Sequence, residues 1–150
     1  MNGNGKKAEV NILMAEDDDG HAHLILERLS EAGIENQVTR FMDGKKAWEF
    51  LSMTGAGEKR EPGKPYLLLL DIKMPRMDGM ELLEKIKADP ALKSLPVIML
   101  TTNEDSDDIR KCYALGCNNY LTKPVAFDKF SQVIKRLGLF LMVMKVSGLD

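Results

Sequence analysis

A polar or charged residue follows or ends each of four short apolar runs in the sequence. The carboxyl ends of parallel strands share one edge of a sheet, so such residues converge even when they are far apart in the chain. Three acids, one hydroxyl and one ammonium would then meet in one crevice. They are Glu16 and Asp17 after Val10–Ala15, Asp71 after Tyr66–Leu70, Thr101 at the end of Pro96–Thr101, and Lys123 in Asn119–Pro124.

These residue types together indicate phosphoryl chemistry assisted by a divalent cation. Carboxylates in one crevice repel one another unless a cation compensates, and Mg2+ binds one or two of them while keeping sites for water and phosphate oxygens. Mn2+ is the alternative ion. A carboxylate beside the metal can attack phosphorus, and Asp71, after the most apolar run, is the best candidate nucleophile. Glu16 and Asp17 are expected to hold the metal, while Lys123 and Thr101 hold the phosphoryl oxygens.

The apolar pattern predicts the elements that bring these residues together. Tyr66–Leu70 is apolar on both faces, which is typical of a central strand in a parallel sheet covered by helices. Helical spacing follows each strand, and five alternating strand–helix units predict a doubly wound α/β fold. The expected strands are Val10–Ala15, Val38–Met42, Tyr66–Leu70, Pro96–Thr101 and Asn119–Pro124, and the expected helices contain Leu24–Ala32, Ala47–Leu51, Met80–Ala88, Ile109–Leu115 and Phe127–Leu137.

Four motifs occur in the chain in a characteristic order. They are ILMAEDD at 12–18, LLLLDIKMPRMDG at 67–79, VIMLTT at 97–102 and YLTKP at 120–124. From about Val10 to Leu137 the chain resembles the receiver domains of bacterial two-component response regulators. The spacing of 30 positions from Asp71 to Thr101, and of 22 from Thr101 to Lys123, is similar to that of chemotaxis-type receivers. The resemblance implies a flavodoxin-like (β/α)5 fold with five parallel strands in the order 2-1-3-4-5.

The resemblance implies a role for each converging residue. Asp71 would accept a phosphoryl group from a sensor histidine kinase in a Mg2+-dependent reaction. Lys123 would pair with the phosphate, Thr101 would move onto the phosphoryl group, and Tyr120 would swing inward on activation. The metal site that it implies consists of Glu16, Asp17, Asp71 and the backbone carbonyl of Lys73.

The sequence departs from the simplest receivers in three places. Glu16 stands where the first acid is more commonly Asp. The 54 residues from Asp17 to Asp71 include a long loop, Thr54–Pro65, which is similar to that of receivers partnering phytochromes. A phytochrome is therefore a candidate kinase. Lys73 and Asn103 occupy positions that tune the lifetime of the phosphate in this family.

The chain length suggests a receiver without an output domain. We expect a disordered lead-in at residues 1–7, the receiver at 8–138, and an apolar extension of the last helix at 139–150. Output would then occur by contact with a protein or by onward phosphotransfer. Eight of the ten residues in Leu137–Val146 are apolar, which favours a homodimer surface, although the Thr54–Pro65 loop or the tail itself is the alternative cover.

Bulk composition sets the remaining expectations. Among 150 residues, 21 Lys and Arg against 23 Asp and Glu give a net charge of -2, which argues against binding nucleic acid by bulk charge. No apolar run reaches the roughly 18 residues that span a bilayer, and the N-terminus does not read as a signal peptide. Two cysteines cannot form a disulfide framework, so we expect a cytoplasmic protein without a membrane partner.

Several polar residues have structural interpretations. Asp18, Asp19 and Asp78 are expected to cap helices or complement their dipoles. His21 and His23 are read as surface or half-buried residues, because positions i and i+2 do not face each other on a helix. Thr101 and Tyr120 could equally serve structure alone. Cys112 and Cys117 are expected to be reduced, half-buried thiols.

Two other function classes compete with the receiver. A phosphohydrolase of the haloacid-dehalogenase type would need a second Asp two residues after Asp71 as general acid, and that residue is Lys73. A flavodoxin-like module for a nucleotide or flavin would need a phosphate-binding loop after the first strand. The acids at 16–19 would repel a phosphate there unless a metal intervened.

Overall fold

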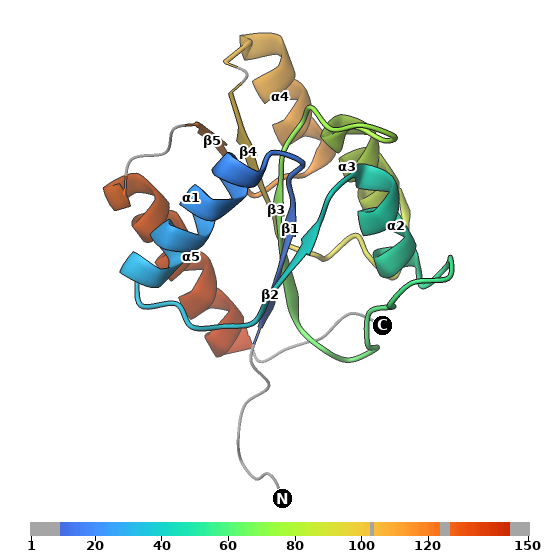
Figure 1. The fold of residues 1–150 in the computed structure, drawn as a ribbon, viewed down its shortest axis with the longest axis horizontal. Coiled ribbons are helices and arrows are strands. Elements are labelled where there is room, and N and C mark those ends of the chain that lie inside the picture. The colour runs from blue at the N-terminus through green and yellow to red at the C-terminus, as the bar shows by residue number, and fades with distance from the viewer. Residues whose placement is uncertain (1–9, 103, 124–126, 145–150) are drawn as a thin grey trace, which may run out of the picture.

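Five short apolar segments pair as parallel strands in a single sheet, in the order β2-β1-β3-β4-β5 (Figure 1). The computed structural model describes residues 10–102, 104–123 and 127–144, with the backbone alone at 127 and 137–144. The predicted α/β class and the strand order implied by the receiver resemblance are both confirmed. The strands are β1 (Asn11–Ala15), β2 (Val38–Phe41), β3 (Tyr66–Leu70), β4 (Val97–Thr101) and β5 (Asn119–Thr122).

The central strand β3 is buried along its whole length, as its continuous apolar sequence predicts. Successive side chains of a strand point to opposite faces of the sheet. Leu68 and Leu70 accordingly enter one apolar cluster, while Leu67 and Leu69 enter the other. Because both faces of β3 are covered, the strand is held in place, and so is the backbone of Asp71, which follows it.

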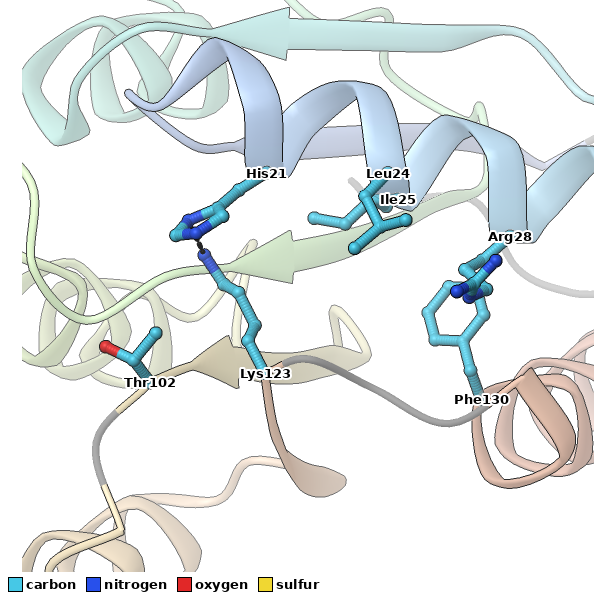
Figure 2. Close-up of a pocket in the computed structure, with 7 residues that line it drawn as sticks. All are labelled: His21, Leu24, Ile25, Arg28, Thr102, Lys123 and Phe130. Carbon is cyan, nitrogen blue, oxygen red and sulfur yellow. Dashed lines mark hydrogen bonds between the residues drawn. The ribbon is translucent and has the colours of Figure 1, made fainter.

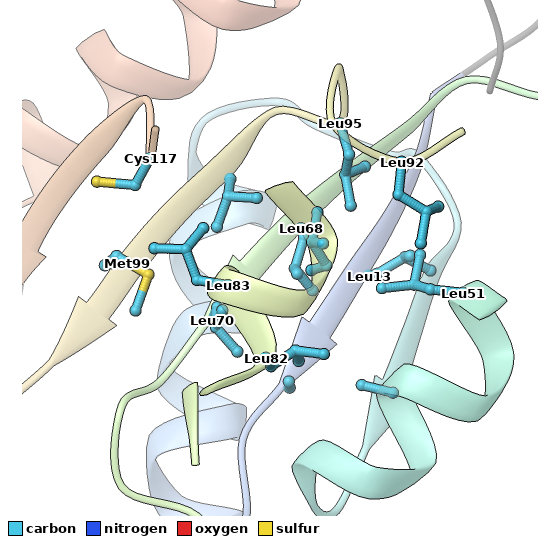
Figure 3. Packing of buried hydrophobic residues seen from close by; sticks show 14 of the residues in the cluster. Leu13, Leu51, Leu68, Leu70, Leu82, Leu83, Leu92, Leu95, Met99 and Cys117 are labelled. Atoms are coloured by element: carbon cyan, nitrogen blue, oxygen red, sulfur yellow. The ribbon is translucent and has the colours of Figure 1, made fainter. Parts of the chain in front are cut away.

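Helices cover both faces of the sheet (Figure 1). One face carries α1 and α5, which contribute Ile25, Leu29 and Phe130 to the core. The other face carries α2, α3 and α4, whose buried side chains pack around Leu68 and Leu70 (Figure 3). The helices are α1 (Asp19–Glu31), α2 (Gly44–Ser52), α3 (Gly79–Ala88), α4 (Ser106–Leu115) and α5 (Phe127–Met144).

An aspartate forms the N-cap of each of the first four helices. Each precedes its helix in extended conformation and accepts a backbone N–H of the first turn. The predicted capping roles of Asp18 and Asp78 are confirmed, and Asp19 lies in the first turn of α1, where its charge complements the helix dipole. Asp43 and Asp105 are the corresponding caps of α2 and α4.

Two details differ from the sequence expectation. Cys112 and Cys117 are buried, not half-buried, because both belong to the core on the α2–α4 face. The fifth strand ends at Thr122, where it pairs with Thr101, and the predicted end at Pro124 lies outside the described residues.

Within the described residues, no helix is both long enough and apolar enough to cross a membrane.

The predicted lead-in at residues 1–7 lies outside the described residues, as do residues 145–150. The backbone of α5 runs to Met144, but the apolar side chains from residue 137 onward are not described. The expected homodimer surface therefore stays a prediction.

The long connection between α2 and β3 is fixed to the end of α2. The last carbonyls of a helix lack partners within it, and Arg60 supplies two donors to them. Its backbone N–H donates to Phe50 O at 3.1 Å, and its Nε donates to Leu51 O at 2.7 Å. Arg60 is only 5% exposed. A loop rich in glycine, proline and charged residues would instead predict an exposed arginine.

Replacing Arg60 by Ala should destabilise the fold by about 1–3 kcal/mol, because it removes a charged donor and leaves the carbonyl of Leu51 buried without it. Urea unfolding followed by circular dichroism measures the change. Lys59→Ala is the matched control, since the exposed Lys59 donates only to carbonyls of its own loop, and it should stay within about 0.5 kcal/mol of wild type. Equal stability of the two variants would contradict the anchoring role.

Candidate functional site

Three acids meet at the carboxyl edge of the sheet, as the sequence predicted. Carboxylate oxygens of Glu16, Asp17 and Asp71 lie within 4.8 Å of one another. Glu16 and Asp71 are buried at the ends of β1 and β3, whereas Asp17 faces solvent. Neighbouring strands of a parallel sheet hold these positions side by side, and Asp71 N–H donates to Ala15 O at 3.1 Å. The cluster therefore combines two buried carboxylates with one open to the outside.

The ammonium of Lys123 lies among these acids. Its Nζ is 3.3 Å from Asp71 Oδ2 and also donates to Glu16 Oε1. The backbone N–H of Lys123 donates to Thr101 O at 2.8 Å, which places the residue directly beyond β5. The side chain is only 7% exposed, so its charge is compensated by these partners more than by water.

Glu16 is held in a shielded position where its charge depends on its neighbours. Burial raises the pKa of its carboxyl above the ordinary value, and the hydrogen bond from Lys123 opposes that rise. The backbone N–H of Asp18 also donates to Glu16 Oε2 at 3.1 Å. The Lys123 ammonium therefore favours the ionised form of this carboxyl, which burial disfavours.

Arg40 fixes the loop that carries the first two acids. From β2, its Nε donates to the backbone carbonyl of Glu16 at 2.9 Å, and its Nη1 pairs with Asp19 at 2.8 Å. These bonds join the start of α1 to the neighbouring edge strand. No sequence pattern indicates this role, because Arg40 lies on a weakly alternating strand far from the motifs.

Thr101 and Tyr120 also lie where the sequence placed them. Thr101 ends β4 and is fully buried. Tyr120 on β5 is 8% exposed and belongs to the core beside α3 and α4. Its backbone N–H donates to the hydroxyl of Tyr113 at 3.1 Å, and burial raises the pKa of its phenol to about 12. The phenol therefore stays protonated at neutral pH.

The loop from β3 to α3 begins at Asp71. Lys73 is exposed in this loop, and the role of its backbone carbonyl stays a prediction. Gly79 N–H donates to Ile72 O at 2.6 Å, and a Cβ at Gly79 would lie 2.0 Å from the carbonyl oxygen of Asp71. Only glycine permits this approach. Asn103, the other residue predicted to tune the phosphate, lies outside the described residues.

The structure adds His21 to the site. Its Nδ1 lies 3.1 Å from Nζ of Lys123, and its side chain is 41% exposed (Figure 2). The half-buried reading of His21 was correct, but it missed this contact. A helical side chain leans toward the helix N-terminus, so a residue three positions after the cap Asp18 can return over the sheet edge. His23 is exposed and pairs with Glu27 at 3.0 Å instead.

A small apolar cavity lies next to Lys123, between α1 and α5. Its volume is about 110 Å³. Leu24, Ile25 and Phe130 project toward it, and the stem of Lys123 borders it (Figure 2). The remaining lining residues are His21, Arg28 and Thr102.

The donor set fits a small divalent cation. All three ligand groups are carboxylates, the oxygen donors that Mg2+ and Mn2+ prefer. Lys123 supplies positive charge to two of the three. The buried pair is thus already arranged around a cation.

Replacing Gly79 by Ala should destabilise the fold by about 1–3 kcal/mol, because the new methyl group would overlap the backbone at Asp71. Urea unfolding again provides the measurement. Gly57→Ala is the control, since a Cβ there meets nothing within 4 Å and should leave stability within about 0.5 kcal/mol. A Gly79→Ala protein as stable as wild type would show that the loop accommodates the methyl group freely.

Comparison with known proteins gives the same assignment as the motifs and the geometry. Response regulator Rcp1 from Synechocystis is 39% identical over 112 residues, covering 75% of this chain and 75% of Rcp1. Its Mn2+-bound crystal structure superimposes with a TM-score of 0.72 at 32% identity, covering 95% of this chain and 99% of that one.

Two further solved structures are similar. A response regulator receiver domain from Rhodospirillum rubrum has a TM-score of 0.77 and 40% identity, covering 94% of this chain and 99% of the other. The phosphorylated cyanobacterial phytochrome response regulator RcpA has a TM-score of 0.74 and 32% identity, covering 95% of this chain and 100% of RcpA. The family model "Response regulator receiver domain" matches residues 12–135. The chain therefore belongs to the response regulator receiver family, the phosphoacceptor proteins of two-component signalling.

Proposed function

We propose that Asp71 is the phosphoacceptor of this response regulator and that its reaction requires Mg2+ or Mn2+. The observation that carries the proposal is the position of its buried carboxylate, 3.3 Å from the Lys123 ammonium and within 4.8 Å of two further carboxylates. A nucleophile, a fixed positive charge and a set of oxygen ligands thus occupy one edge of the sheet.

The transfer step places Asp71 of this chain on one side of phosphorus and the donor's histidine nitrogen on the other. An Asp71 oxygen forms a bond to phosphorus while the bond from phosphorus to the donor's histidine nitrogen breaks, and the histidine leaves with that electron pair. Lys123 balances charge on the phosphoryl oxygens. The hydroxyl of Thr101 would donate to one of them after moving toward Asp71.

The metal site would consist of Glu16, Asp17, Asp71 and the backbone carbonyl of Lys73. When bound, the ion neutralises the carboxylates and the incoming phosphoryl oxygens. The three-carboxylate cluster supports this assignment, and the relative Rcp1 has been crystallised with Mn2+. Glu16, with its longer side chain, reaches the same cluster from the end of β1.

The signal would leave through Thr101 and Tyr120. Movement of Thr101 toward a phosphorylated Asp71 vacates space in the core, and Tyr120 adjusts with it as one of two packed arrangements. The hydrogen bond from Tyr120 N–H to the exposed Tyr113 links this position to the surface of α4. Surface change at α4 and β5 would then be read by a protein partner or precede onward phosphotransfer.

We further propose a sensor histidine kinase of the phytochrome class as the donor, in the cytoplasm. The similarity to RcpA, a cyanobacterial phytochrome response regulator, supports this choice. A homodimer through the C-terminal helix region is the accompanying proposal, based on the apolar sequence from residue 137.

Replacing Asp71 by Asn should abolish phosphorylation by acetyl phosphate with Mg2+, because the amide cannot act as the nucleophile. Intact-protein mass spectrometry and peptide mapping detect the label. Asp78→Asn is the matched control: it also removes one acid, but Asn caps α3 equally well, so labelling should match wild type. Undiminished labelling of the Asp71→Asn protein at another residue would overturn the assignment.

Replacing Asp17 by Asn should weaken Mg2+ and Mn2+ binding by about tenfold or more, since loss of even an indirect partner of a metal ligand has effects of that size. Isothermal titration calorimetry measures the affinity. Asp18→Asn removes the same charge one residue away and keeps the cap of α1, so its affinity should fall less than about threefold. Equal losses in both variants would indicate attraction by bulk charge instead of a ligand site.

A further inference from the structure

The side chain of His21 contacts the ammonium of Lys123, beside the carboxylates of Glu16 and Asp71. Figure 2 shows its ring above Lys123, reaching down from the first turn of α1. Glu16 Oε2 and Asp18 Oδ1 lie 3.9 and 4.0 Å from the same Nδ1, beyond hydrogen-bond distance. The contact with Lys123, at 3.1 Å, is therefore the short polar contact of this ring nitrogen.

Lys123 has as many acceptors as it has protons. An ammonium carries three N–H donors and no acceptor, so each neighbour must accept from it. Glu16 Oε1, Asp71 Oδ2 and His21 Nδ1 fill these three positions. Because the ammonium can only donate, His21 accepts in this contact only as the tautomer that leaves Nδ1 unprotonated and carries its proton on Nε2.

Two of these three acceptors are needed elsewhere during the reaction. Glu16 and Asp71 belong to the carboxylate cluster that fits a divalent cation, and Asp71 is the proposed acceptor of the phosphoryl group. When Glu16 and Asp71 bind a metal ion, or Asp71 binds the phosphoryl group, fewer of their oxygen lone pairs remain available to the Lys123 ammonium. His21 lies outside the carboxylate cluster, so its contact with the ammonium does not compete with a metal ion or a phosphoryl group for the same atoms.

Besides His21, the side chains that line the cavity beside Lys123 offer one acceptor, the hydroxyl of Thr102. The stem of Lys123 borders a cavity formed largely by Leu24, Ile25 and Phe130, which cannot accept a hydrogen bond. An ammonium that lost its acceptors would be stranded against apolar surface or would turn away toward water. Either outcome removes positive charge from the carboxylate where the phosphoryl group must arrive.

We propose that His21 is a positioning residue for phosphoryl transfer, whose Nδ1 holds the Lys123 ammonium beside Asp71 when the metal and the phosphoryl group engage the carboxylates. This role rests on the proposed function of Asp71. His21 touches neither the nucleophile nor the phosphorus, and it acts through Lys123.

Two substitutions separate the acceptor from the ring. His21→Phe keeps a ring but has no acceptor, while His21→Asn places a carbonyl oxygen near the position of Nδ1. We expect His21→Phe to lower the maximal rate of phosphorylation by acetyl phosphate at saturating Mg2+ about tenfold, with Mg2+ affinity unchanged. His21→Asn should return the rate to within about threefold of wild type. His23→Leu, on the exposed side of the same helix, should have no effect.

A second measurement uses the metal-free protein and no reaction. Nitrogen-15 NMR in mildly alkaline buffer should show His21 as the tautomer protonated on Nε2. Lys123→Met removes the donor and should shift the Nδ1 resonance, whereas the His23 resonances should not move. Urea unfolding identifies variants that are not folded, and His21→Leu replaces His21→Phe in that event.

Three outcomes would overturn the positioning role. They are an undiminished rate in His21→Phe, an equal loss in His21→Asn, and a proton on Nδ1 in the metal-free protein. Failure of the proposed function would look different, because wild-type protein itself would then remain unlabelled at Asp71.

Discussion

The ion pairs of Lys123 with Glu16 and Asp71 are the interaction on which the carboxyl edge of this protein depends. Parallel strands bring acids from β1 and β3 into contact whether or not charge favours it. Burial then raises the cost of ionising them, and the pKa of Glu16 rises accordingly. One ammonium from the end of β5 offsets both effects, so the sheet order and the charge balance support each other.

Backbone contacts hold the residues around these ion pairs in place. Lys123 N–H bonds to Thr101 O, Asp71 N–H bonds to Ala15 O, and Gly79 closes onto the carbonyl of Asp71. The backbone that carries the Asp71 carboxylate is therefore held in place. The proposed phosphorylation of Asp71 would then act on the side chains around it, among them those of Lys123 and Thr101.

Sequence patterns predicted the fold and the converging residues because both follow from strand ends in a parallel sheet. The run Tyr66–Leu70, apolar on both faces, is enough to predict a central strand. Contacts that depend on side-chain direction were not predictable. His21 was compared with His23 on its own helix, whereas its partner is Lys123, from another strand. Arg60 reads as a solvated loop cation, and only the free carbonyls of α2 explain its burial.

The anchoring of the α2–β3 connection has a practical consequence for observing this protein. Arg60 ties the loop to α2 at the amino edge of the sheet, the opposite end from the acids (Figure 1). The segment before it is exposed, and a Cβ added at Gly57 would meet nothing within 4 Å. A fluorescent reporter attached there would be held by the Arg60 anchor and would lie away from the carboxylate cluster.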